Sequence, residues 1–106
     1  MAWVYLVAAG ILEIVWAYTL KQSHGFTRLL PAAISITTMI ASVGLLALAM
    51  RTLPLGTAYT IWTGMGAVGA FALGIFVLGE LASPTRIAAF VLIVSGLMMM
   101  KLSATA

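Results

Sequence analysis

The chain has 106 residues, of which 64% are hydrophobic and only 7% are charged, and its mean hydropathy is +1.22. Because soluble domains carry about 25% charged residues, this composition excludes an ordinary soluble domain and indicates an integral membrane protein. Disulfide bonds are excluded because the chain has no cysteine, and the net charge of +3 is spread singly over loops rather than forming the basic patch that nucleic-acid binding requires.

Four apolar stretches predict four transmembrane helices in a single domain of residues 1–106. A helix needs about 20 mostly apolar residues to cross the hydrocarbon core of a bilayer. The first three stretches have this length, whereas the fourth reaches it only if Arg86 and Lys101 extend their charged ends toward the membrane surfaces. The expected helices cover approximately residues 2–20, 29–50, 55–79 and 84–102.

The first stretch resembles a secretory signal peptide only in its position. A signal peptide begins with a basic segment, which is missing here because residues 2–20 contain no lysine or arginine. No convincing cleavage site precedes Lys21, so we expect this helix to be retained. The segments between the stretches are short, and Pro54, Gly56 and Pro84 are typical of helix boundaries. An even number of helices places both termini on the same side of the membrane.

Lysine and arginine residues give almost no orientation signal. Arg51 and Lys101 lie on the side with both termini, whereas Lys21, Arg28 and Arg86 lie on the other side. Because basic loops set membrane orientation, this balance leaves open either a fixed orientation or insertion in both orientations. Alternating access usually requires two repeats of inverted topology, and this chain has no internal repeat. Two copies in opposite orientations would supply the missing repeat, so we expect an antiparallel homodimer.

Glu13 is the only charged residue in the first stretch and one of two acidic residues in the chain. A carboxylate at membrane depth costs several kcal/mol and usually marks a functional site. Gly10 and Trp16 lie three residues before and after it, on the same helix face. The alternative is a permanently protonated glutamate with a purely structural role.

The second and third stretches contain polar and aromatic residues that are candidates to face Glu13. A serine in a membrane helix commonly bonds its own helix backbone, so Ser42 gains a functional meaning only if it faces Glu13. Tyr59 and Trp62 share one face of the third helix. A buried tyrosine hydroxyl and a buried indole N–H need hydrogen-bond partners, and we expect Glu13 to accept from them.

Residues 64–69 match the pattern G-x-G-x-x-G, which also occurs in dinucleotide-binding proteins. That motif requires a preceding strand in a βαβ unit, whereas these glycines lie in an apolar helix, so we exclude nucleotide binding. We expect Gly64, Gly66 and Gly69 to form a point where the third helix bends.

In the fourth helix, Ala89 and Gly96 lie on one face, which predicts a dimer-packing surface.

Two other charged residues have simpler interpretations. Lys101 is either an anchor at the membrane surface or a partner of the first helix near Gly10. Glu80 follows the third helix and is predicted to be a solvated loop charge. We expect neither a metal nor a cofactor.

A carboxyl group buried among aromatic residues is suited to exchange a proton for a cation. Burial favours its neutral form and a bound cation favours its ionised form, so Glu13 would hold one ligand or the other. This exclusion would couple proton entry to cation exit. A flat guanidinium ion can stack on Trp16 or Trp62 and can bond both carboxylate oxygens. It also stays charged at physiological pH and therefore needs a transporter.

Three blocks of sequence are distinctive, namely residues 10–17 (GILEIVWA), residues 25–29 (GFTRL) with Pro31, and residues 53–69 (LPLGTAYTIWTGMGAVG). Through these blocks the sequence resembles the small multidrug resistance family over essentially its full length. Residues of the guanidinium-exporter branch within that family are also present, namely Trp16, Gly56-Thr57-Ala58, Trp62-Thr63-Gly64 and Lys101.

This resemblance implies an antiparallel, dual-topology homodimer of four-helix subunits in the bacterial cytoplasmic membrane. It implies proton-coupled export of guanidinium through a site shared by Glu13 of both subunits. Tyr59 is further expected to coordinate the two subunits as the transporter switches sides. The site residues implied are Glu13, Trp16, Ser42, Tyr59 and Trp62, and those of secondary importance are Gly10, Met39, Thr63 and Lys101.

Three alternatives to this function stay open at the level of sequence. A broader exporter of quaternary ammonium cations would use the same Glu13. One half of a heterodimeric exporter would be inactive alone, although the balanced loop charges argue mildly against it. A membrane subunit without transport activity would be unaffected by Glu13→Gln.

Overall fold

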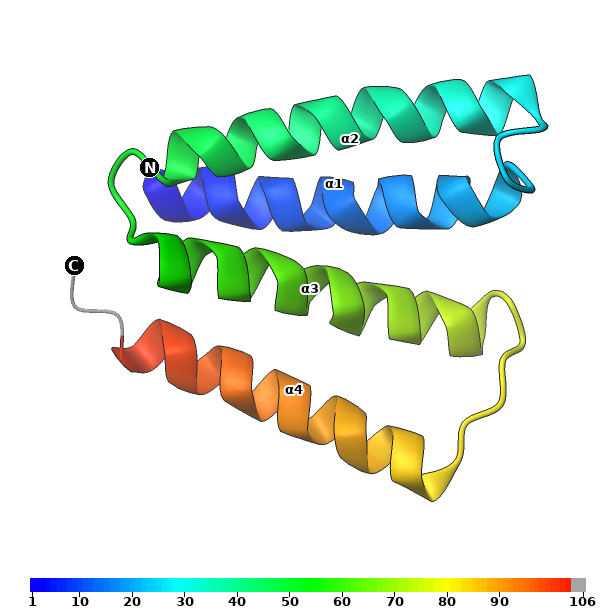
Figure 1. Ribbon diagram of the computed structural model, residues 1–106. Coiled ribbons are helices and arrows are strands. Elements are labelled where there is room, and N and C mark those ends of the chain that lie inside the picture. Colours follow the sequence, from blue (N-terminus) through cyan, green and yellow to red (C-terminus); the bar gives the residue numbers. More distant parts are fainter. Residues whose placement is uncertain (104–106) are drawn as a thin grey trace.

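A computed structural model describes residues 1–103 and shows an all-helical chain (Figure 1). Each helix is long and apolar enough to cross a membrane, which confirms the prediction of four candidate transmembrane helices. The last three residues of the predicted domain, 104–106, lie outside the described residues. The helices are α1 (Ala2–Gln22), α2 (Leu29–Ala49), α3 (Leu55–Phe76) and α4 (Pro84–Ser103).

The third helix ends at Phe76, before the expected end near residue 79. The backbone N–H of Leu78 donates to the Leu73 carbonyl (3.0 Å), and Gly79 adopts a φ of +72°, in the left-handed region. Glycine enters this region without the steric penalty that a Cβ imposes, so Gly79 reverses the chain after the helix. The turn directs the following loop back toward α4.

The helices form one flat layer in the order α2, α1, α3, α4 (Figure 1). The molecule measures 42 × 35 × 16 Å. An α-helix with its side chains is about 10–12 Å across, so the shortest dimension is little more than one helix. Both faces of the layer are therefore open, and many large apolar side chains are exposed on them. Such side chains are compatible with lipid but leave a single copy without an enclosed chamber.

Close contact between α1 and α3 depends on residues without bulky side chains. A Cβ at Gly69 would overlap the side chain of Ile14, and a Cβ at Gly10 would overlap the side chain of Met65. Lipid removes the hydrophobic driving force between helices, so van der Waals packing at small residues has to hold them together. The glycines of α3 thus allow its backbone to approach α1.

Two buried serines of α2 connect this helix to the backbone of α1. The Ser35 hydroxyl donates to the Trp16 carbonyl (3.0 Å), and the Ser42 hydroxyl donates to the Ala9 carbonyl (2.6 Å). The exposed Thr37 instead bonds its own helix at the Ala33 carbonyl (2.8 Å). The serines therefore fix the position of α2 along α1.

The backbone of the fourth helix approaches only α3, and the helix contains no buried residue. Phe71 and Phe90 stack across this contact with ring centroids 5.1 Å apart, and a Cβ at Gly64 would overlap Leu97. Ala89 is exposed, and the space around Gly96 is open. Most of the α4 surface is therefore available for contacts outside this copy.

We predict that Gly69→Val destabilises the protein, because its branched side chain would collide with Ile14 of α1. Overpacking a tight contact costs about 1–3 kcal/mol. The midpoint of thermal unfolding in detergent should fall relative to the wild-type protein. Gly44→Val on α2 is the matched control, because the space around Gly44 is open. Equal midpoints for the two variants would contradict this account of the α1–α3 contact.

Candidate functional site

The carboxyl group of Glu13 lies between α1 and α3, against the backbone of Gly66. A Cβ at Gly66 would overlap Oε1 and Cδ of Glu13, so any other residue at this position would displace the carboxyl group from where it lies. Oε1 is buried and accepts no hydrogen bond from the described residues. Leaving a buried polar atom unpaired costs about 1–3 kcal/mol, and native structures rarely tolerate this without a functional reason. Glu13 is therefore a buried acceptor ready for a proton or a donor ligand.

Trp16 lies one helical turn beyond Glu13 and contributes a second unpaired group. Its indole Nε1 is buried and donates no hydrogen bond within the described residues. Its backbone carbonyl is occupied by Ser35, which fixes the residue to α2. An aromatic face and an unused N–H thus adjoin a carboxyl group on the same side of α1.

Ser42 of α2 links α1, α2 and α3 at the level of the site. Its hydroxyl donates to the Ala9 carbonyl on α1 and accepts from the indole Nε1 of Trp62 on α3 (3.0 Å). The expectation that the Trp62 N–H donates to Glu13 is therefore wrong. Ser42 satisfies the indole instead, which leaves the Glu13 oxygen uncommitted.

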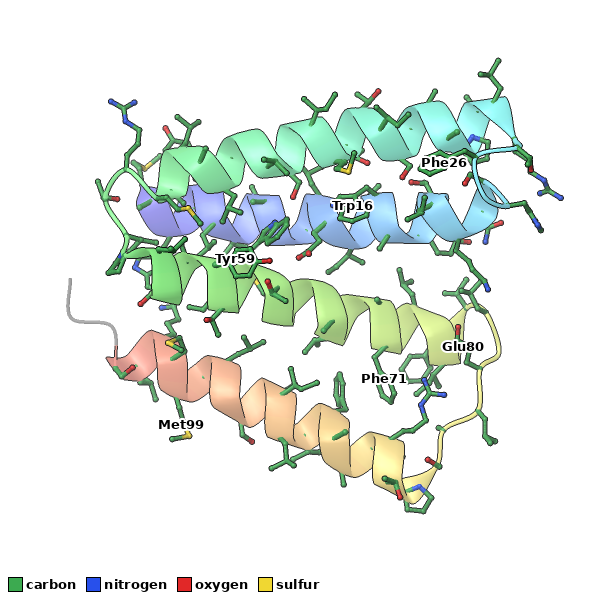
Figure 2. All side chains as sticks on the ribbon, in the orientation of Figure 1. Trp16, Phe26, Tyr59, Phe71, Glu80 and Met99 are labelled. Carbon is green, nitrogen blue, oxygen red and sulfur yellow. The ribbon has the colours of Figure 1, made fainter. Side chains whose placement is uncertain are left out.

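Tyr59 lies one turn before Trp62 on α3, and its ring is tilted against the indole with centroids 5.7 Å apart. The tyrosine is 52% exposed, so the expected bond from a buried Tyr59 hydroxyl to Glu13 is also absent. Tyr59 and Trp16 come from neighbouring helices of the layer (Figure 2). The structure thus brings Glu13, Trp16, Ser42 and Trp62 to one region, with Tyr59 at its open edge.

The residues of secondary importance are more dispersed. Met39 and Thr63 are exposed, and Thr63 lines an apolar cavity between α3 and α4 together with Tyr59. Lys101 lies over the Trp3 ring, with Nζ 5.0 Å from its centroid. Lys101 therefore contacts the first helix, as one alternative predicted, but at Trp3 rather than near Gly10, which lies against Met65. Lys101 contacts the first turn of α1, which suits an anchor near the helix ends.

Gly66, Ala70 and Gly74 recur every four positions on α3, a spacing that predicts close helix packing, and Gly66 does lie against a side chain of α1. A bend at Gly64, Gly66 and Gly69 stays a prediction, because α3 is one unbroken helix through these positions. The spacing identifies Gly66 as a position of close approach. What it could not indicate is which side chain of α1 fills the space beside Gly66.

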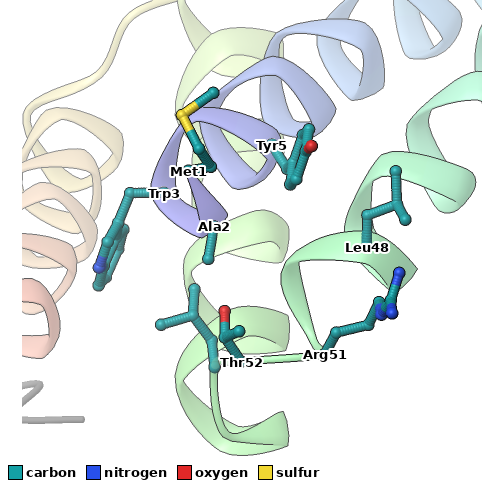
Figure 3. Close-up of a pocket in the computed structure, with 8 residues that line it drawn as sticks. Met1, Ala2, Trp3, Tyr5, Leu48, Arg51 and Thr52 are labelled. Atoms are coloured by element: carbon teal, nitrogen blue, oxygen red, sulfur yellow. The ribbon is translucent and has the colours of Figure 1, made fainter.

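A large open pocket of about 560 Å³ lies at the other end of α1 from Lys21 (Figure 3). Its walls include Trp3 and Tyr5 from α1 and Leu48 and Arg51 from the end of α2 and the loop that follows. Arg51 is the only charged side chain in this lining. Because like charges repel, this pocket is poorly suited to a cation.

Residues 1–93 match the family described as Small Multidrug Resistance protein. The chain belongs to this family. It is 57% identical over 103 residues to the guanidinium exporters of Escherichia coli (strain K12) and Citrobacter freundii, covering 97% of this chain and 98% of each relative. It is 58% identical over 104 residues to the guanidinium exporter of Salmonella typhimurium (strain LT2), covering 98% of this chain and 99% of that relative.

We predict that Ser42→Ala leaves the Trp62 indole without its acceptor and shifts its N–H resonance in the NMR spectrum. The unpaired donor should also lower stability by about 1–3 kcal/mol. Ser35→Ala is the matched control, because it removes a buried serine of α2 that bonds Trp16 rather than Trp62. An equal shift of the Trp62 resonance in both variants would show that Ser42 does not hold the indole.

Proposed function

We propose that this protein is a secondary transporter, not an enzyme, and that it exports guanidinium ion in exchange for protons. The observation that carries the proposal is the buried, uncommitted Glu13 oxygen beside Trp16 and Trp62. Near-full-length similarity to relatives named guanidinium exporters supports the substrate. The four apolar helices support a multi-pass membrane location, and similarity to the bacterial relatives supports the bacterial cytoplasmic membrane.

The chemistry of guanidinium fits the groups present in this region. The ion is planar and offers N–H donors in a fixed fork, which matches the two oxygens of a carboxylate. Its flat face can stack on an indole ring, an interaction worth roughly 0.5–2 kcal/mol when water is excluded. The N–H of Trp62 is already bound to Ser42, so it does not compete for the carboxylate.

Coupling follows from the single carboxyl group. A proton neutralises Glu13 and removes its attraction for the cation, whereas a bound cation favours the ionised carboxylate. Each ligand therefore displaces the other. Glu13 is the only charged residue between residues 2 and 20, so no basic side chain within seven residues of it on α1 can neutralise it in place of the substrate.

An antiparallel homodimer would enclose the site that one copy leaves open. The single layer of helices is only 16 Å thick, and α4 has no buried residue. A second copy in the opposite orientation would cover the exposed Tyr59 edge and supply the inverted repeat that alternating access requires. Ala89 and Gly96 lie on the exposed part of α4 and are proposed as packing positions.

Transport currents in proteoliposomes test the proposed function. Guanidinium should elicit a current with the wild-type protein, and Glu13→Gln should abolish it, because glutamine keeps the shape but cannot exchange a proton. Protein-free liposomes provide the baseline. Tetrapropylammonium tests selectivity, since comparable currents with both cations would assign a broader quaternary ammonium exporter. The absence of current with either cation would refute transport by this chain alone.

The dual-topology arrangement is testable because the chain has no cysteine of its own. His24→Cys introduces one thiol in the exposed loop between α1 and α2. With copies in both orientations, a membrane-impermeant maleimide added to intact cells should label about half of them, and the rest only after permeabilisation. Labelling of all copies or of none from outside would contradict the antiparallel dimer.

A further inference from the structure

Three different groups hold the guanidinium group of Arg86, at the start of α4. Nη2 lies 3.7 Å from Oε1 of Glu80, and Nη1 donates to the Leu81 carbonyl (3.1 Å). The centre of the guanidinium group lies 5.3 Å from the centroid of the Phe71 ring. A carboxylate, a carbonyl and an aromatic face are the groups that recognise a guanidinium ion. The Arg86 side chain ends in the same chemical group as the proposed substrate.

Glu80 is held in place by the end of α3 rather than projecting freely from a loop. Its backbone N–H donates to the Gly74 carbonyl (2.8 Å), and its carboxyl group lies against Gly74, where a Cβ would overlap Oε1. Phe71 and Glu80 both lie toward the end of α3 that leads into this loop (Figure 2). The carboxylate and the aromatic face are therefore fixed by the same helix end.

Water and small ions can reach this cluster. The side chains of Arg86 and Glu80 are 46% and 43% exposed. An exposed ion pair contributes little to stability and is weakened by salt, so an external cation can compete with Arg86. A cavity of about 220 Å³ borders Phe71 and Arg86, and another of about 140 Å³ borders Glu80. Lys21 also lines the second cavity and is the other basic group near Glu80.

We propose that Glu80, the Leu81 carbonyl and Phe71 form a peripheral guanidinium-binding site, in which Arg86 is a built-in competitor that substrate displaces. The inference rests on the proposed function, because it takes guanidinium as the substrate. At such a site the cation would bind at the loop end of α3 before it reaches Glu13. In an antiparallel dimer, each face of the membrane has one such site.

NMR of the full-length protein in detergent micelles tests the displacement directly. The chain has three arginines, so the side-chain Nε–H resonance of Arg86 is assigned by its loss in Arg86→Lys. The titration uses the Glu13→Gln protein, which removes the central carboxylate, and compares guanidinium chloride with potassium chloride at equal concentration. We expect a saturable shift of the Arg86 resonance with guanidinium only, while Arg28 and Arg51 serve as internal controls.

Two variants separate specific binding from a general effect of salt. Glu80→Gln should abolish the saturable shift, and Phe71→Leu should raise the guanidinium concentration at half-saturation several-fold. The proposal is overturned if Arg86 moves no more than Arg28 and Arg51, or if potassium produces the same shift. A guanidinium current without displacement of Arg86 refutes this site alone, whereas displacement without a guanidinium current refutes only the proposed function.

Discussion

The contact between the Glu13 carboxyl group and the backbone of Gly66 is the constraint on which the rest of the structure depends. It requires α1 and α3 to approach at the position where a charged group is most costly in a membrane. Gly69 and Gly10 make the same approach possible on either side, through Ile14 and Met65. The packing of α1 on α3 and the burial of the acid thus depend on small residues of both helices.

The hydrogen bond between Trp62 and Ser42 removes one competing donor from the buried oxygen of Glu13. The Trp62 indole donates to Ser42, and Ser42 in turn donates to the α1 backbone at Ala9. A donor bound permanently to Glu13 would favour the ionised form and would have to be displaced by every substrate. The network instead fixes the aromatic ring and keeps the carboxyl group available for exchange. This division of roles is compatible with a transporter that must release its ligand as readily as it binds it.

The two acidic residues of the chain each lie against a glycine of α3. Glu13 lies against Gly66 and Glu80 lies against Gly74, both on α3, but the first is buried and the second is exposed. Coulomb interactions are weaker in water than in a low-dielectric interior, so the proposed peripheral site at Glu80 would attract a cation less strongly than the buried carboxyl group of Glu13. A cation moving from the loop toward the membrane interior would therefore meet increasing affinity.

Sequence alone determined the four helices and singled out Glu13, because hydrophobic length and the rarity of charge in lipid are local properties of the chain. It also indicated Trp16, Ser42 and Trp62 as candidates, but it wrongly paired the Trp62 N–H with Glu13. Only the tertiary structure decided these partners, because hydrogen bonds between helices depend on their relative rotation and axial position. It likewise revealed that Gly66 makes room for the acid and that Arg86 is held by Glu80 and Phe71. Periodicity shows which residues share a face, whereas the residue opposite that face is fixed only when the helices pack.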